Sequence, residues 1–396
     1  VLEGRITANL DSIPPPSSFG GATIDIDVNE EYKYIITSRG CAHDCSFCCS
    51  PSFWKRRVRY RSPAAIMSEI ETIYRRHGII YFSIRDDNFT LMRTRVMEFT
   101  QRLRESGIYM MWNCQSRVDS VDLEMLVAMK RAGLEHIQYG VESGSERILK
   151  QYNKRVSIDE IRRAAKLTRD AGVYLSIYLM AGMRGETAAD TAKTRSLIRS
   201  ILPGDGIVSP VALYPGTALY EREKAEGRID DSVWFRRPDS GIFMRNDEQA
   251  ARFVHDLLNE LSMIRERSWY RRADFARHRK ATGGDCWVTD ILEGDYYLDE
   301  EDYPSAELCY LRVIKKTPEN PWGYMRMGKL KFRTSDFPGA VEHYTAVTQA
   351  APAYYGGWLK LAESNIAVGD RASARKCLAR AHSLNRFDRR IANLMT

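Results

Sequence analysis

The feature that most constrains the fold of this chain is a unit that recurs along its first half. Each unit consists of an amphipathic helical stretch, a glycine, and a short run of residues that favour β-strands. The glycines are Gly78, Gly107, Gly133, Gly172 and, in a looser case, Gly204. The runs that follow them are residues 79–84, 108–112, 136–139, 173–180 and 207–213, and residues 34–37 form an earlier run of the same kind. A glycine after a helix accepts the left-handed backbone that ends it.

These runs are almost wholly apolar, which is typical of parallel strands covered by helices on their faces. The sequence therefore predicts an α/β fold built from six βα units. A doubly wound sheet would also fit, but we expect a partial (β/α)6 TIM-type barrel. In both architectures the functional groups gather at the carboxyl ends of the strands.

The last third of the chain repeats with a period of 34 residues. Ala306, Ala340 and Ala374 are spaced by 34 residues, as are Tyr310 and Tyr344. This period, with small residues where helices cross, resembles the tetratricopeptide repeat. The resemblance implies an all-α domain of about three helix pairs, with a groove for a peptide or protein partner. In the alternative interpretation, the groove only packs against the barrel.

The chain of 396 residues is long enough for two or three domains. The expected segments are a lead-in or linker at 1–30, the barrel at 31–240, a connecting helical segment at 241–285, and the repeats at 286–396. The connecting segment carries a basic stretch with aromatic residues near Arg271, which can contact nucleic-acid phosphates. The net charge of +7 permits an acidic partner without requiring one, and we favour a solvated helix face over a nucleic-acid partner.

Composition excludes two other classes of protein. The longest apolar stretch, Val173–Met183, is interrupted by Ser176 and is shorter than the roughly 18 residues that a membrane span needs. Four of the eight cysteines lie within Cys41–Cys49, whereas a secreted disulfide framework would spread them along the chain. We therefore expect a cytoplasmic protein with a metal or reactive site. The four isolated cysteines are expected to be small core residues: Cys114, Cys286, Cys309 and Cys377.

The clustered cysteines directly follow the first predicted strand. Cys41, Cys45 and Cys48 lie on one loop, and three thiolates can hold an iron–sulfur cluster while leaving one iron open for a small molecule. Zinc is the alternative, with His43 or Cys49 as a fourth ligand. Zinc ribbons usually pair two closely spaced ligand couples, and this sequence has no second couple.

The spacing Cys41-x3-Cys45-x2-Cys48, with Phe47 before the last cysteine, resembles the signature of the radical S-adenosylmethionine (SAM) superfamily. The resemblance implies that these cysteines hold a [4Fe-4S] cluster whose fourth iron binds the amino and carboxylate groups of SAM. One electron then releases methionine and a 5′-deoxyadenosyl radical, which abstracts hydrogen from a substrate. It also implies a reductant such as flavodoxin or ferredoxin.

The same resemblance implies contacts to SAM, beginning with Phe47 on the cysteine loop. Asp86 and Asp87 close the second strand, where carboxylates suit the methionine amine. Glu142 and Ser143 follow the fourth strand in a segment that resembles the family's Gly-x-Glu-Ser motif. We expect them near the ribose or the methionine end.

A further segment after the fifth strand resembles the part of the family that contacts adenine. It contains Met180 and Gly182, and the glycine would allow close approach of the nucleotide. Glu186 is expected to cap the helix that follows.

Within the superfamily, three segments together resemble the cobalamin-associated branch: Asp86–Phe89, Trp112–Cys114 with Arg117, and Gly140–Ser145. That branch includes methyltransferases acting on unactivated carbon as well as ring-forming enzymes, and a cobalamin-binding domain precedes its barrel. No Asp-x-His-x-x-Gly signature of that domain occurs in this sequence. Methylation at carbon of an unidentified substrate is the leading expectation. The alternatives are a repeat-based scaffold with a structural metal and a radical SAM enzyme that modifies RNA.

Overall fold

The computed structural model describes residues 7–18, 26–236 and 241–395. Its first part is a six-stranded parallel sheet whose strand order follows the sequence without reversal. The strands are β1 (Tyr34–Ile35), β4 (Tyr81–Ile84), β5 (Met111–Ser116), β6 (Leu134–Glu142), β7 (Tyr174–Ala181) and β8 (Asp205–Pro210). An unreversed order is that of a partial barrel, because a doubly wound sheet changes direction at its centre. The α/β fold is therefore confirmed.

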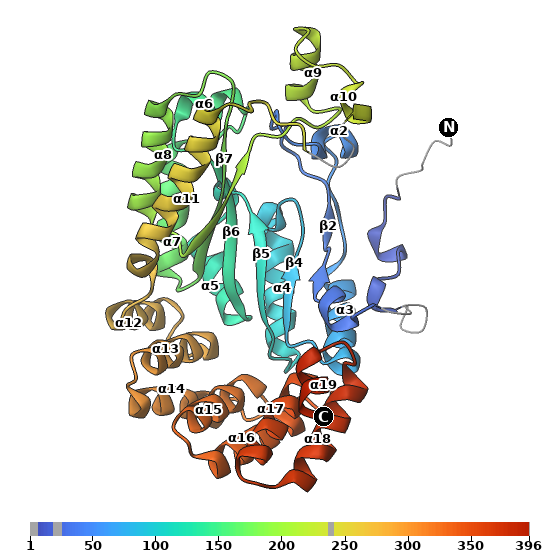
Figure 1. The fold of residues 1–396 in the computed structure, drawn as a ribbon, viewed down its shortest axis with the longest axis vertical. Helices are drawn as coiled ribbons and strands as arrows, with labels where there is room; N and C mark the ends of the chain where they lie inside the picture. The colour runs from blue at the N-terminus through green and yellow to red at the C-terminus, as the bar shows by residue number, and fades with distance from the viewer. Residues whose placement is uncertain (1–6, 19–25, 237–240, 396) are drawn as a thin grey trace.

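Helices cover the outer face of this sheet (Figure 1). They are α3 (Pro63–His77), α4 (Arg93–Glu105), α5 (Leu123–Arg131), α7 (Ile158–Asp170) and α8 (Ala188–Ile201). Outward side chains of the strands pack with them in the main core, where Trp112 stacks on Phe82 at a ring distance of 5.8 Å. The indole of Trp112 also donates to the Ala132 carbonyl, so its polar atom is satisfied within the core.

Short elements surround the carboxyl ends of the strands. They are β2 (Ser38–Arg39), α2 (Ser50–Trp54), β3 (Arg59–Tyr60), α6 (Glu146–Gln151), α9 (Ala218–Ala225) and α10 (Val233–Arg236). Helix α1 (Val28–Glu31) instead precedes β1 at the amino end, where the Asn29 side chain donates to the Leu384 carbonyl. Strands β2 and β3 pair antiparallel on either side of the cysteine loop and α2. This small ribbon thus fixes both ends of the segment that carries the cysteines.

The third strand begins and ends later than its apolar run predicts. The predicted run 108–112 overlaps β5 only at Met111 and Trp112, and the strand continues to Ser116. Trp112 and Cys114 are buried in the core, while Asn113 and Gln115 alternate with them and are only partly buried. Successive strand residues point to opposite faces, so the inner wall of this barrel includes polar side chains that a search for apolar runs misses.

Helix α11 (Glu248–Ser268) belongs to the core of the α/β domain although it lies in the expected connecting segment. Phe253 and Leu257 share the main core. The buried carboxylate of Glu260 accepts hydrogen bonds from Arg195 and Arg199 on α8. Helix α12 (Arg272–Ala281) then leads into the C-terminal region.

The C-terminal region is entirely helical within the described residues. Its helices are α13 (Trp287–Asp299), α14 (Tyr303–Lys316), α15 (Pro321–Arg333), α16 (Phe337–Ala350), α17 (Tyr355–Ala367), α18 (Arg371–Leu384) and α19 (Arg389–Met395). Asp302, Asp336 and Asp370 cap α14, α16 and α18 by the same contact to the amide three residues on. The 34-residue period therefore corresponds to a structural repeat of helix pairs.

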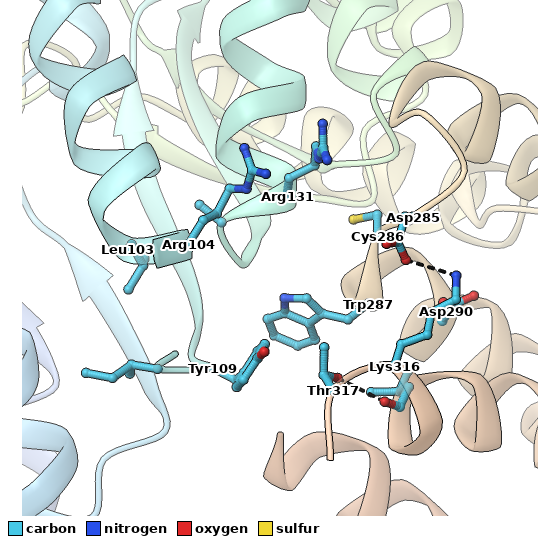
Figure 2. A pocket seen from close by; sticks show the side chains of 13 residues that line it. Leu103, Arg104, Tyr109, Arg131, Asp285, Cys286, Trp287, Asp290, Lys316 and Thr317 are labelled. Atoms are coloured by element: carbon cyan, nitrogen blue, oxygen red, sulfur yellow. Dashed lines mark hydrogen bonds and ion pairs between the residues drawn. The ribbon is translucent and has the colours of Figure 1, made fainter. Parts of the chain in front are cut away.

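The helical region packs beneath the amino ends of the strands (Figure 1). Ile80 and Met111, beside the starts of β4 and β5, share a hydrophobic cluster with side chains of α13 to α15. A crevice of about 180 Å3 remains between the two regions, where Tyr109 meets Trp287 edge to face at 6.0 Å (Figure 2). Part of the repeat surface is therefore used for contact with the α/β domain.

No helix among residues 7–18, 26–236 and 241–395 is long and apolar enough to cross a membrane. The longest of them, α11, has 21 residues but carries several charged side chains. The apolar stretch Val173–Met183 contributes β7 instead.

Gly78 provides a test of the contact between the two regions. Its φ of +61° ends α3, and a Cβ there would lie 1.9 Å from the Ala353 carbonyl oxygen. Gly107 has a similar φ of +68° but open space around it. We expect Gly107→Ala to cost about 1 kcal/mol of unfolding free energy through backbone strain alone. Gly78→Ala should cost at least about 2 kcal/mol more, because the backbone of the repeat region must move. Urea unfolding measures both, and equal losses would contradict this packing.

Candidate functional site

A cavity of about 310 Å3 lies at the carboxyl ends of the strands, where the loops after β1 and β4 to β7 meet. Cys41, Cys45, Phe47 and Cys48 form one side of it. Facing side chains include Asp87, Gln115, Arg117, Gln138, Glu142, Lys154, Tyr178, Met180 and Ser209. The three cysteines expected to hold a cluster therefore share one cavity with four of the seven expected SAM contacts. The other three, Asp86, Ser143 and Gly182, do not line it.

The cysteine loop is anchored by backbone contacts at several points. Gly40 has a φ of +98°, and a Cβ there would lie 2.2 Å from the Arg57 carbonyl oxygen, so only glycine fits where the loop begins. Ser46 donates its amide to the Tyr152 carbonyl and accepts from the Leu219 amide through its own carbonyl. These contacts hold the loop over the strand ends.

The number and placement of the thiols in the cavity fit an iron–sulfur cluster. Burial raises the pKa of the Cys41 thiol and raises that of Cys48 to about 12, so metal binding has to release their protons. Across the described part of the chain, no three Cys, His, Asp or Glu side chains converge on the position of one metal ion. Cys49, proposed as a fourth zinc ligand, is exposed and does not line the cavity. Three thiols around a cavity suit a cubane, whose ligands are spread over several irons.

A buried ion pair lies across the cavity from the cysteines. The Lys154 ammonium is 2.7 Å from a carboxylate oxygen of Glu142, and both residues are nearly inaccessible to solvent. Glu142 has a φ of +66° where the β6–β7 register shifts. A Cβ on Gly140 would lie 2.5 Å from that carboxylate oxygen and 2.8 Å from the Lys154 nitrogen, so Gly140 leaves room for the pair. An ammonium and a carboxylate in one cavity complement a zwitterionic ligand.

The adjacent residues Asp86 and Asp87 have different positions. Asp86 is buried and accepts hydrogen bonds from the amides of Thr37 and Ser38, at 2.6 and 2.9 Å, and from both of their hydroxyls. It therefore ties the end of β4 to the segment that enters the cysteine loop. Asp87 lines the cavity and accepts from the Ser50 hydroxyl at 2.7 Å.

Ser143 and Gly182 lie behind the wall of the cavity. The Ser143 hydroxyl contacts Thr194 and accepts from the Ser145 amide, which shapes the turn before α6. Gly182 has a φ of +89° and donates its amide to the Glu186 carboxylate at 2.6 Å.

The expected role of Glu186 as a helix cap is wrong. Its carboxylate accepts from the amides of Gly182 and Met183 and so closes the loop after β7. The Thr187 side chain caps α8 instead, in a capping box with Asp190. Thr187 caps the helix in place of Glu186 because a threonine directly before a helix can accept from the amide three residues on.

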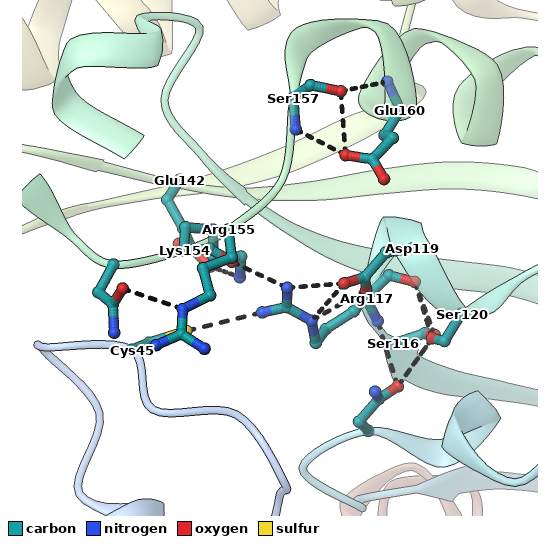
Figure 3. Close-up of polar contacts among 12 residues, drawn as sticks. Cys45, Ser116, Arg117, Asp119, Ser120, Glu142, Lys154, Arg155, Ser157 and Glu160 are labelled. Carbon is teal, nitrogen blue, oxygen red and sulfur yellow. Dashed lines mark hydrogen bonds and ion pairs between the residues drawn. The ribbon is translucent and has the colours of Figure 1, made fainter. Parts of the chain in front are cut away.

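Arg117 and Asp119 form a polar cluster beside Cys45 (Figure 3). The guanidinium is 5% exposed, and its Nη1 lies 3.6 Å from the Cys45 sulfur. It also donates to the Asp119 carboxylate and, at 2.9 Å, to the Lys154 carbonyl. Although burial raises the pKa of Asp119, hydrogen bonding and charge from Arg117 hold that pKa below its ordinary value.

Below the cavity, the inner wall of the barrel is a chain of hydrogen-bonding side chains. Gln115 donates to Gln138, which donates to the Ser176 hydroxyl, both at 3.3 Å. On the neighbouring strands the Ser83 hydroxyl donates to Asn113 at 2.6 Å. The interior is therefore suited to a ligand that itself donates and accepts hydrogen bonds.

Residues 35–198 match the family model described as the Radical SAM superfamily. Residues 35–198 form a radical SAM domain. A domain of this superfamily implies a [4Fe-4S] cluster and SAM as cofactors. The matched region begins at β1 and ends in α8, so it contains all the cavity residues except Ser209.

Three curated relatives resemble parts of the chain. An anaerobic magnesium-protoporphyrin IX monomethyl ester cyclase of Rubrivivax gelatinosus is 28% identical over 51% of this chain and 38% of its own length. An uncharacterized methyltransferase of Pyrococcus horikoshii is 28% identical over 57% of this chain and 50% of its own length. A hopanoid C-3 methylase of Methylococcus capsulatus is 31% identical over 37% of this chain and 28% of its own length. The matches thus span half or less of these relatives.

Among solved structures, the radical SAM methyltransferase TsrM from Kitasatospora setae shares the fold. It superposes with a TM-score of 0.51 at 16% identity and covers 69% of this chain and 61% of its own. A second TsrM structure, with cobalamin and a [4Fe-4S] cluster bound, superposes with a TM-score of 0.50. At this identity, the comparison concerns the fold alone.

Proposed function

We propose that this chain acts as a radical SAM enzyme that cleaves SAM reductively and modifies an unidentified substrate, with methylation at carbon as the reaction. Cys41, Cys45 and Cys48 would hold the [4Fe-4S] cluster. The observation that carries the proposal is their presence in one cavity with the buried Lys154–Glu142 pair.

In this proposal the residues around the cavity bind and orient SAM. Lys154 attracts the methionine carboxylate, while Glu142 and Asp87 accept from the amine, because each charge meets its opposite in a partly desolvated site. Phe47 and Met180 supply apolar contacts that exclude water from the nucleoside. A bound [4Fe-4S] cluster supplies the one-electron chemistry that breaks the sulfonium bond. A reductant such as flavodoxin or ferredoxin would supply the electron.

Methylation is the reaction that the relatives favour. Both the Pyrococcus horikoshii and the Methylococcus capsulatus relatives are named as methyl-transferring enzymes, and the fold neighbour TsrM is a methyltransferase whose structure holds cobalamin. We therefore propose cobalamin as a second cofactor of the complete enzyme. The polar wall around Gln115, Gln138 and Ser176 supports a substrate that carries amide or hydroxyl groups.

Anaerobic reconstitution tests this function. The chain is supplied with iron and sulfide, reduced with dithionite and incubated with SAM, and the products are identified by mass spectrometry. We expect 5′-deoxyadenosine and methionine above a control without protein. A chain that retains zinc, takes up no iron and forms no 5′-deoxyadenosine would favour the scaffold with a structural metal instead.

We propose a separate role for the helical region, as a tetratricopeptide-repeat domain that binds an acidic peptide. A groove of about 540 Å3 between α15 and α17 is lined by aromatic side chains and by more cations than anions. Lys329 is an exposed cation of this groove. We expect Lys329→Glu to weaken binding of a fluorescein-labelled hexaglutamate peptide about tenfold, which fluorescence anisotropy measures. Lys376→Glu, on α18 outside the groove, is the matched control, and equal binding by the two variants would contradict the assignment.

A further inference from the structure

Arg117 directly contacts a proposed cluster ligand. Its Nη1 lies 3.6 Å from the Cys45 sulfur. The guanidinium is nearly inaccessible to solvent, so its field at the cysteines is weakly screened.

The surroundings of Arg117 fix the direction in which its charge points. Asp119 accepts from Nε at 3.0 Å and from Nη2 at 2.9 Å, in the two-pronged geometry of an arginine–carboxylate pair. The Lys154 carbonyl accepts a further hydrogen bond from Nη2 at 2.9 Å. The Arg117 amide donates to Asn88 at 3.3 Å. With Nε and Nη2 held in this way, the planar guanidinium directs Nη1 toward Cys45 (Figure 3).

We propose that Arg117 is a positioning residue that raises the reduction potential of the cluster, and that Asp119 offsets part of its charge. This inference rests on the proposed function, because it requires a cluster on Cys45. Reduction adds one negative charge to the cluster, and a cation that donates to a ligand sulfur stabilises the reduced form more than the oxidised form. A buried guanidinium is suited to this role because it stays protonated when desolvated.

Redox titration of reconstituted variants, followed by electron paramagnetic resonance (EPR), tests the inference. At the wild-type midpoint potential, the ratio of reduced to oxidised cluster is expected to fall about tenfold in Arg117→Gln, which corresponds to about 59 mV for a one-electron couple. Asp119→Asn should shift the midpoint in the opposite direction, because it removes a negative charge and leaves the guanidinium. Arg117→Lys keeps the charge and should restore most of the wild-type value. Arg163→Gln, at an exposed position of α7, is the control and should leave the potential unchanged.

Opposite shifts of the midpoint potential in Arg117→Gln and Asp119→Asn would support the proposal. If the two residues only supported the loop, the sign of the shift would not follow the sign of the charge removed. Wild-type potentials in both variants, with intact clusters, would overturn the proposal and leave the proposed function standing. If Arg117→Gln fails to retain a cluster, the other two variants decide. A raised midpoint potential in Asp119→Asn with a nearly wild-type potential in Arg117→Lys would support the proposal, and a wild-type potential in Asp119→Asn would overturn it. If the wild-type chain binds no cluster, the proposed function and this inference both fail.

Discussion

Alanine at Cys41, Cys45 or Cys48 is expected to abolish cluster binding and to reduce 5′-deoxyadenosine formation to background, whereas Cys49→Ala leaves both intact. Each of the first three thiols lines the cavity, while Cys49 is adjacent in sequence but exposed. A cubane with only two protein ligands loses an anchoring thiolate that no cavity side chain can replace. Iron and sulfide content per chain after anaerobic gel filtration measures binding.

Cys49→Ala is a closely matched control, because it removes a thiol from the same loop. Loss of iron from this variant as well would contradict the ligand assignment, because Cys49 would then take part in cluster binding. Retention of a full cluster by any of the three single variants would contradict it also.

The buried Lys154–Glu142 pair should affect both stability and SAM binding. Removing either partner leaves an uncompensated buried charge, so Lys154→Met and Glu142→Gln are each expected to lower the unfolding free energy of the metal-free chain by about 3 kcal/mol. The double variant should recover most of that loss, because no buried charge remains. Urea unfolding under anaerobic conditions measures all three.

SAM affinity distinguishes a ligand-binding pair from a structural one. Equilibrium dialysis of the reconstituted variants should show at least about tenfold weaker SAM binding in both single variants, since each loses one charge that complements the methionine zwitterion. The double variant should stay weak although its stability recovers. Wild-type affinity in the double variant would show that the pair serves the fold alone.

The parts of the fold that depend on local sequence were predictable. Gly78, Gly107, Gly133 and Gly172 all adopt positive φ at the predicted helix ends, because a left-handed residue after a helix has a strong local signature. The 34-residue period was equally clear in the sequence, because the same type of helix cap recurs in each repeat. The cysteine cluster was visible because its three thiols lie within one loop.

The parts of the site that depend on distant contacts were not predictable. Nothing in the local sequence distinguishes Asp86 from Asp87. Asp86 turns away from the cavity because the hydroxyls of Thr37 and Ser38, which lie far away in the sequence, donate to it. The sequence did not indicate Lys154, because its partner, Glu142, is on another element. The two side chains can meet because Gly140 has no Cβ to occupy the space between them. The signal available in the sequence was a charged residue, Lys154, near left-handed loop positions in the segment that follows the Gly-x-Glu-Ser motif.

Two larger features were hidden for the same reason. Helix α11 has an apolar face, but only the tertiary structure shows that this face covers β7 and β8 rather than joining two domains. The packing of the repeats beneath the strands rests on scattered residues such as Ile80 and Met111, which read as ordinary strand residues in the sequence.

We propose that Cys41, Cys45 and Cys48 hold a cluster with one iron available to SAM. The most direct test is the EPR spectrum of the reduced, reconstituted chain, recorded before and after SAM is added. We expect a [4Fe-4S] signal whose g-values and line shape change on addition of SAM, because the nucleotide binds the open iron. A reduced chain without a cluster signal, or with one that saturating SAM leaves unaltered, would contradict this assignment.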